Sequence, residues 1–164
     1  MLSCRGLTRS SEWRQGVDLV DVVDPATRSR MMAGIRGKHT RPEVSLRRAL
    51  HARGLRFRLH DRKLPGAPDI VLPGRKTVIL VQGCFWHRHQ GCRYASTPTT
   101  RPEFWSRKFG ETIARDERNV ALLQGQGWRV ALVWECALRR TGAQAIADRI
   151  IEWLARKDGE LTVE

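Results

Sequence analysis

Residues 82–92 contain two cysteines and two histidines, which makes them the segment of this 164-residue chain best suited to bind a metal ion. Thiolate and imidazole are the ligands that a tetrahedral zinc ion prefers. A further cysteine follows the apolar segment 128–134, which reads as a buried strand. If that strand lies beside the one that ends at residue 81, the fourth ligand reaches the same place. Four protein ligands leave no open position, so the pattern predicts a structural zinc site. The ligands are Cys84, His89, Cys92 and Cys136.

The sequence leaves the identity of the histidine ligand open, since either His87 or His89 could complete this site. We assign His89 to zinc because the spacing on both sides lets it turn toward Cys92. His87 is then free for chemistry. The alternative interpretation is that the cysteines are buried free thiols and the two histidines are incidental.

A second candidate for metal chemistry is Asp69, which opens a short strand over 69–72. The strand over 77–81 returns beside it. A carboxylate at the mouth of one strand, near polar groups at the end of its neighbour, is a common way to hold Mg²⁺ in a nuclease. An aspartate that ends a turn is the alternative. The acid and lysine of the restriction-type pattern are missing, because residues 80–82 are leucine, valine and glutamine. Imidazoles titrate near neutral pH, so His87 is the best candidate to activate water.

The charge balance favours a polyanionic partner. Lysine and arginine number 30 against 17 acidic residues, which gives a net charge of +13, and nucleic acid is the leading candidate. The alternative is a basic protein without such a partner. The sequence shows neither an apolar signal region nor a membrane-length apolar run, so we expect a cytoplasmic protein that reaches the nucleoid through DNA. A reducing compartment argues against disulfides among its four cysteines.

Several basic residues are candidates for contacts to DNA phosphates, which set affinity and salt dependence but carry little base information. They are Arg28, Arg30, Arg36, Lys38, Arg41, Arg101, Arg107, Lys108 and Arg115. We expect Arg47 and Arg48 to lie on a solvated helix face instead. Met32 is a candidate to insert into the minor groove, with a buried core methionine as the alternative.

The expected elements define one α/β domain in which helices flank a mixed sheet. Residues 1–24 form a basic arm whose weak periodicity is consistent with disorder. Residues 25–157 form the folded domain, and 158–164 form a tail. Helices are expected over 27–35, 42–53, 100–123 and 143–155, and strands over 57–59, 69–72, 77–81 and 128–134.

Five blocks in this order resemble the very short patch repair endonucleases, the Vsr family, over about residues 24–156. The blocks are residues 26–29 with Met32, 64–66 before Pro68 and Asp69, 83–87, 100–105, and 127–130 leading to 133–139. The resemblance implies a restriction-endonuclease-like core. It also implies an enzyme that nicks one strand on the 5′ side of the thymine in a T:G mismatch, the product of 5-methylcytosine deamination.

The resemblance also implies roles for individual residues. Asp69 and the backbone carbonyl of Val81 would hold Mg²⁺, His87 would activate water, and Glu43 would act nearby through the water network. Gln82 stands where some relatives have a histidine that assists at the phosphate. The zinc ligands of the family match the four residues given above.

Three aromatic residues, Phe85, Trp86 and Trp105, match the wedge that this family inserts into DNA beside the mismatch. A wobble pair stacks poorly, so opening the neighbouring step costs less than at a matched pair. Core packing of these rings is the alternative. Thr112 stands where a member of the family has an asparagine that touches bases. The resemblance therefore leaves the flanking sequence preference of this chain open.

The sequence thus predicts a monomeric, Mg²⁺-dependent endonuclease whose partner is double-stranded DNA with a T:G mismatch, with downstream repair proteins as further partners. One alternative is a restriction-type or nicking endonuclease that acts on a specific matched site. Another is a catalytically silent zinc DNA-binding protein, which the missing acid and lysine favour.

Overall fold

The computed structural model describes Asp24, residues 26–27, Arg30, and residues 37–156 and 159–164. Several expectations lie outside these residues. They are the arm over 1–23, most of the helix over 27–35, and the DNA contacts of Arg28, Met32 and Arg36.

The centre of the fold is a four-stranded mixed sheet in the order β1-β2-β3-β4. Strand β1 (Ile70–Leu72) pairs antiparallel with β2 (Thr77–Gln82), and β2 pairs parallel with β3 (Arg129–Trp134). The mixed sheet expected from the sequence is therefore confirmed. The strand expected over 57–59 is reduced to a single antiparallel bridge between Arg58 and Val71.

Strand β4 (Leu161–Val163) lies parallel to β3, within the segment that the sequence assigned to a tail. Its three residues are too few for a periodic pattern to be recognised. Val163 is fully buried, so this segment contributes to the core.

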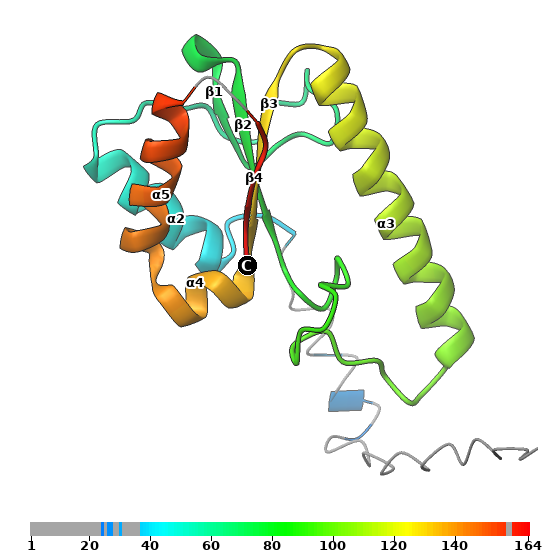
Figure 1. Ribbon diagram of the computed structural model, residues 1–164. Helices are drawn as coiled ribbons and strands as arrows, with labels where there is room; N and C mark the ends of the chain where they lie inside the picture. The colour runs from blue at the N-terminus through cyan, green and yellow to red at the C-terminus, as the bar shows by residue number, and fades with distance from the viewer. Residues whose placement is uncertain (1–23, 25, 28–29, 31–36, 157–158) are drawn as a thin grey trace, which may run out of the picture.

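Helices cover both faces of the sheet (Figure 1). Helices α2 (Arg41–Ala52), α4 (Glu135–Thr141) and α5 (Ala143–Ala155) lie together on one side, and α3 (Pro102–Gly125) lies on the other. Among the described residues, none of the helices has both the length and the apolar character that a membrane span requires. Helix α4 was not expected; it begins directly after β3 and carries Cys136 in its first turn.

The larger core lies between the sheet and helices α2, α4 and α5. It contains fully buried aliphatic side chains such as Leu46, Leu50, Ile79, Ile146 and Ile150. Burying one such side chain contributes about 1.5–3 kcal/mol. This packing makes the sheet and three helices a rigid support for the polar residues at the ends of β1 and β2.

Helix α3 packs on the sheet only through its C-terminal half. Leu123 is buried against Val71, Val78 and Val130, and Val120 packs beside them. The N-terminal half diverges from the sheet and runs past the loop that follows β2 (Figure 1). This divergence leaves room for a polar cleft between α3 and the ends of the strands.

Candidate active site and metal centre

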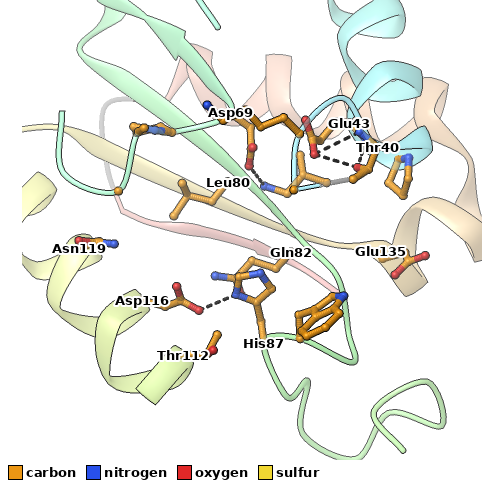
Figure 2. A pocket seen from close by; sticks show the side chains of 18 of the residues that line it. Thr40, Glu43, Asp69, Leu80, Gln82, His87, Thr112, Asp116, Asn119 and Glu135 are labelled. Carbon is orange, nitrogen blue, oxygen red and sulfur yellow. Dashed lines mark hydrogen bonds and ion pairs between the residues drawn. The ribbon is translucent and has the colours of Figure 1, made fainter. Parts of the chain in front are cut away.

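A cleft of about 920 Å³ opens between the start of α2, the end of β2 and the face of α3. The four side chains expected to act in catalysis, Glu43, Asp69, Gln82 and His87, all line it (Figure 2). They come from a helix, the residue before β1, the last residue of β2 and the loop that follows. The fold thus brings together residues that lie up to 44 positions apart in the sequence.

Asp69 is held at the junction of β1 and β2. Its Oδ2 accepts a hydrogen bond of 2.8 Å from the backbone N–H of Val81. The pKa of Asp69 is raised to about 6, chiefly by burial and also by the nearby charge of Glu43, against the opposing effect of that hydrogen bond. A carboxylate whose ionised form is disfavoured in this way gains from a bound cation, so the site fits a divalent metal ion.

Glu43 reaches this carboxylate from the first turn of α2. It forms a capping box with Thr40, whose hydroxyl donates to Glu43 Oε1 at 2.9 Å. Ligand atoms of Glu43, His60 and Asp69 lie within 4.8 Å of one another, so a metal ion held at Asp69 would lie close to the carboxylate of Glu43. Carboxylate oxygens suit Mg²⁺.

His60 was missed by the sequence analysis because it belongs to no recognisable motif. Burial lowers its pKa, and the positive charge of Arg47 lowers it further. Its Nδ1 lies 3.8 Å from Asp69 Oδ1, and its Nε2 lies 3.8 Å from Glu43 Oε2.

His87 contacts Asp116 of α3 on the wall of the cleft opposite Asp69 (Figure 2). The distance from His87 Nδ1 to Asp116 Oδ2 is 2.5 Å. Burial alone would raise the pKa of Asp116, but hydrogen bonds from His87 and Arg115 lower it overall. An ionised carboxylate can only accept, so Nδ1 of His87 carries the proton of this bond and Nε2 keeps a lone pair. The arrangement suits a general base.

Asp116 was also missed by the sequence analysis, although a signal for it exists. Thr112, Asp116 and Asn119 recur at helical spacing on one face of α3, and all three line the cleft.

The opposite wall of the cleft approaches this face closely at Gly66. That glycine has φ of +72°, and a Cβ on it would lie 2.7 Å from Asn119 Nδ2. A larger residue at this position would force the side chain of Asn119 to move.

The sequence suggested that Arg47 lies on a solvated helix face, but the structure buries it. It is 7% exposed, and its Nη2 lies 2.5 Å from Glu43 Oε2. The neighbouring Arg48 is exposed. The prediction for Arg47 failed because α2 buries a wider face than its apolar residues indicate, and Arg47 lies one turn beyond Glu43 on that face.

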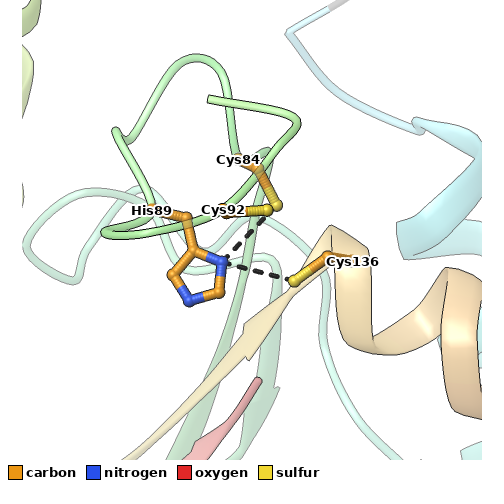
Figure 3. Close-up of side chains that lie close together, drawn as sticks. All are labelled: Cys84, His89, Cys92 and Cys136. Atoms are coloured by element: carbon orange, nitrogen blue, oxygen red, sulfur yellow. Dashed lines mark hydrogen bonds between the residues drawn. The ribbon is translucent and has the colours of Figure 1, made fainter. Parts of the chain in front are cut away.

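The predicted zinc ligands converge on one point (Figure 3). Ligand atoms of Cys84, His89, Cys92 and Cys136 lie within 4.8 Å of one another. His89 Nδ1 lies 3.8 Å from Cys84 Sγ and 3.3 Å from Cys136 Sγ. A tetrahedral zinc ion with normal bond lengths would separate such atoms by about 3.6 Å. The donor set and its spacing therefore fit zinc, and the structure brings His89 rather than His87 to this group.

Sheet register explains how the ligands meet. In the parallel pair of β2 and β3, Gln82 lies opposite Trp134, and Cys84 and Cys136 follow these residues at the same offset. The imidazole of His89 stacks on the ring of Trp134 with centroids 4.1 Å apart.

The aromatic residues expected to form a wedge gather beside the cleft. Phe85 makes edge contacts with Trp86, Trp105 and Phe109, at centroid distances of 5.1–5.5 Å. Phe85, Trp86 and Trp105 are half-buried, whereas Phe109 is 6% exposed. Phe109 therefore acts as the buried base of the cluster. Trp86 also lines the cleft, so the cluster borders the candidate catalytic residues.

The basic residues expected to contact DNA are distributed unevenly. Lys38, Lys108 and Arg115 line the cleft. Arg101 lies outside that lining at the start of α3, with its guanidinium 4.9 Å from the centre of the Phe104 ring. Thr112 donates its hydroxyl to the backbone carbonyl of Lys108 at 2.9 Å.

Comparison with known proteins gives consistent matches. The family described as DNA mismatch endonuclease Vsr matches residues 20–93. A type II nicking enzyme of Xanthomonas oryzae pv. oryzae, V.XorIIP, is 49% identical over 125 residues, which cover 76% of this chain and 91% of the relative. The type II nicking enzyme V.NmeAIP of Neisseria meningitidis is 38% identical over 74% of this chain and 86% of its own.

The DNA mismatch endonuclease Vsr of Escherichia coli K12 is 41% identical over 149 residues. The match covers 89% of this chain and 95% of that relative, so its span includes the cleft and the four predicted zinc ligands. Similarity of this extent shows common descent and a shared fold. The chain therefore belongs to the Vsr family of DNA endonucleases.

Proposed function

We propose that this endonuclease uses Mg²⁺ to nick one strand of double-stranded DNA on the 5′ side of the thymine in a T:G mismatch. The observation that carries the proposal is the meeting of three features in one cleft. Asp69 lies on one wall, the His87–Asp116 pair lies on the other, and the half-buried aromatic cluster borders both.

In this proposal, the carboxylate of Asp69 and the backbone carbonyl of Val81 hold Mg²⁺. When bound, Mg²⁺ polarises the scissile phosphate and offsets the charge that develops on it. Glu43 lies close enough to order water near Asp69. Gln82 lines the same cleft, and its amide donates a hydrogen bond to the phosphate without transferring a proton.

His87 is the general base of the proposed reaction. Its Nε2 takes a proton from the attacking water, whose oxygen forms the new bond to phosphorus. The bond from phosphorus to the 3′ oxygen breaks and this oxygen takes a proton from solvent water, so the products carry a 5′-phosphate and a 3′-hydroxyl. Asp116 holds the imidazole in the required tautomer and stabilises the positive charge that it acquires.

The half-exposed aromatic cluster supports recognition of a mismatch. Unstacking a base step costs a few kcal/mol, and stacking of a base on an aromatic ring recovers about 1–3 kcal/mol. The balance favours insertion where the DNA is already poorly stacked, as at a wobble pair. Lys38, Lys108 and Arg115 would contact the phosphates on either side.

A second candidate is a nicking enzyme with another site preference, because two of the relatives are named as type II nicking enzymes. The two functions can be separated with a panel of end-labelled duplexes that carry T:G, other mismatches or matched pairs in one sequence context. We expect fast nicking of T:G alone. Equal nicking of the matched duplex would favour the second candidate.

Trp86→Ala should reduce the preference for T:G over matched DNA by about tenfold or more, because an inserted aromatic ring contributes about 1–3 kcal/mol. The measurement is the ratio of single-turnover nicking rates on the two duplexes. The matched control is Trp128→Ala, since Trp128 packs on the opposite end of α3. An equal loss on both duplexes in Trp86→Ala would assign Trp86 to packing instead.

Cys136→Ser should release zinc and lower the thermal stability of the protein, since a structural zinc site contributes directly to folding. Zinc content by elemental analysis and the melting temperature are the measurements. We expect less than half of the wild-type zinc and a decrease of about 10 °C or more, because several kcal/mol are lost and each shifts Tm by a few degrees. Unchanged zinc content would remove Cys136 from the ligand set.

A further inference from the structure

Arg47 is a buried cation directly behind the carboxylates of the cleft. Its side chain is 8% exposed. Nη2 lies 2.5 Å from Glu43 Oε2 and 2.9 Å from His60 Nε2, and Nη1 lies 2.8 Å from His39 Nδ1. One guanidinium therefore joins an acidic residue of the site to two histidines from other segments.

These contacts determine which nitrogen of His60 carries its proton. A guanidinium only donates hydrogen bonds, so His60 Nε2 must accept from Arg47. The proton of the neutral ring then lies on Nδ1, the atom that faces Asp69 Oδ1 at 3.8 Å. The other oxygen, Oδ2, already accepts from the N–H of Val81. Both oxygens of Asp69 thus face an N–H group whose position the fold fixes.

Stability alone does not account for this arrangement. The desolvation of a buried ion pair offsets most of its Coulombic gain, so such a pair adds little net stability compared with apolar residues. Apart from Glu43 and Arg47, the buried face of α2 is apolar, with Leu46 and Leu50 fully buried. A buried arginine at this place is therefore better explained by its effect on Glu43 and His60.

We propose that Arg47 is a positioning residue for the metal-binding end of the nuclease site. It fixes the carboxylate of Glu43 and the tautomer of His60, whose Nδ1–H then faces Asp69. The inference rests on the proposed function of Asp69 and Glu43. Arg47 does not touch DNA or the reacting atoms in this role.

The charge of Arg47 gives the proposal a distinctive signature. Arg47 offsets one of the two negative charges of Glu43 and Asp69, so removing it leaves a more negative site. A divalent cation should then bind the DNA-free protein more tightly, while the orientation needed for the reaction is lost. Damage to the fold would instead weaken both cation binding and nicking.

The test compares Arg47→Met and Arg47→Lys in the full chain with zinc bound. Mn²⁺ affinity is measured by calorimetry in the absence of DNA. DNA affinity is measured in the absence of divalent metal, and the nicking rate is measured under single-turnover conditions. Arg47→Met should nick about 10–100-fold more slowly, the usual effect of losing a group that orients metal ligands. Its Mn²⁺ affinity should rise and its DNA affinity should stay within about threefold of wild type. Arg47→Lys should be intermediate in rate, since an ammonium lacks the planar fork that reaches both Glu43 and His60.

Arg48→Met is the matched control, because Arg48 is the exposed neighbour on the same helix. It should change none of the three quantities. A wild-type nicking rate in Arg47→Met, or a fall in Mn²⁺ affinity alongside the rate, would overturn the inference. If Arg47→Met does not fold, a wild-type nicking rate in Arg47→Lys would likewise overturn the inference. Failure of the proposed function can be distinguished from failure of the Arg47 inference. The nicking rates can be compared on any duplex that the wild type nicks, and the Mn²⁺ titration requires no duplex.

Discussion

Asp69→Asn is expected to slow nicking by at least about a thousandfold and, at the same time, to stabilise the DNA-free protein at pH 8. The loss of rate follows from the loss of a charged metal ligand. A bound metal ion stabilises the transition state of phosphate hydrolysis by several kcal/mol, and each 1.36 kcal/mol corresponds to about tenfold in rate. Single-turnover nicking of a T:G duplex measures this effect.

The gain in stability follows from the raised pKa of Asp69. Its ordinary value of 3.8 rises to about 6 in the folded protein, so the folded state binds the proton more tightly than the unfolded chain does. Stability therefore falls as pH rises from about 4 to about 6, and the loss is complete above that range. The difference between the two pKa values corresponds to at most about 3 kcal/mol. An asparagine removes this cost and can still accept from the Val81 N–H.

Denaturant unfolding with zinc bound and Mg²⁺ omitted measures the stability change. Asp69→Asn should be more stable than wild type at pH 8, and the gain should shrink at pH 5. Asp61→Asn is the matched control, because Asp61 lies outside the lining of the cleft and accepts a hydrogen bond from the Lys63 N–H. Nicking by Asp69→Asn within tenfold of wild type would show that Asp69 is not the metal ligand.

His87→Gln is expected to lower the single-turnover rate by about 10²–10⁴-fold, the usual contribution of a positioned general base. DNA affinity should change little, because the imidazole acts on water rather than on the duplex. Asp116→Asn should give a smaller loss in the same direction. The asparagine can still accept from Nδ1 of His87, but it lacks the charge that stabilises the protonated ring.

Glu117→Gln is the control for Asp116→Asn, because Glu117 is the exposed neighbour on α3. It should nick at the wild-type rate. Zinc content separates the roles of the two histidines, since His89 lies with the cysteines and His87 does not. Zinc loss in His87→Gln would place His87 in the metal centre and contradict its assignment as the base.

The long periodic elements of the fold were predictable from the sequence. The helix expected over 143–155 coincides with α5, and α2, α3 and β3 begin and end within about two residues of their expected limits. Each has an apolar pattern or a clear terminal signal, such as the proline at the start of α3. Helix α4 and strand β4 were missed because they are short and depend on tertiary contacts, such as the burial of Val163 beside β3.

The candidate site was predictable where ligand chemistry coincided with spacing. The cysteines and His89 follow a pattern, and the parallel pairing of β2 with β3 delivers Cys136 to the same point. Asp116, His60 and Arg47 carry no motif, and each gains its role from a partner far away in the sequence or buried beside it. Such partners become visible only when the helices are placed on the sheet.

In the proposed reaction, a divalent cation held at Asp69 drives the cutting of a single strand at a mismatch. The most direct test maps the cut in a T:G duplex labelled on either strand, with Mg²⁺ present or omitted and zinc bound throughout. We expect one nick, on the 5′ side of the mismatched thymine, which depends on Mg²⁺ and leaves the guanine strand intact. Cutting of both strands, or a nick of undiminished rate without divalent metal, would contradict it.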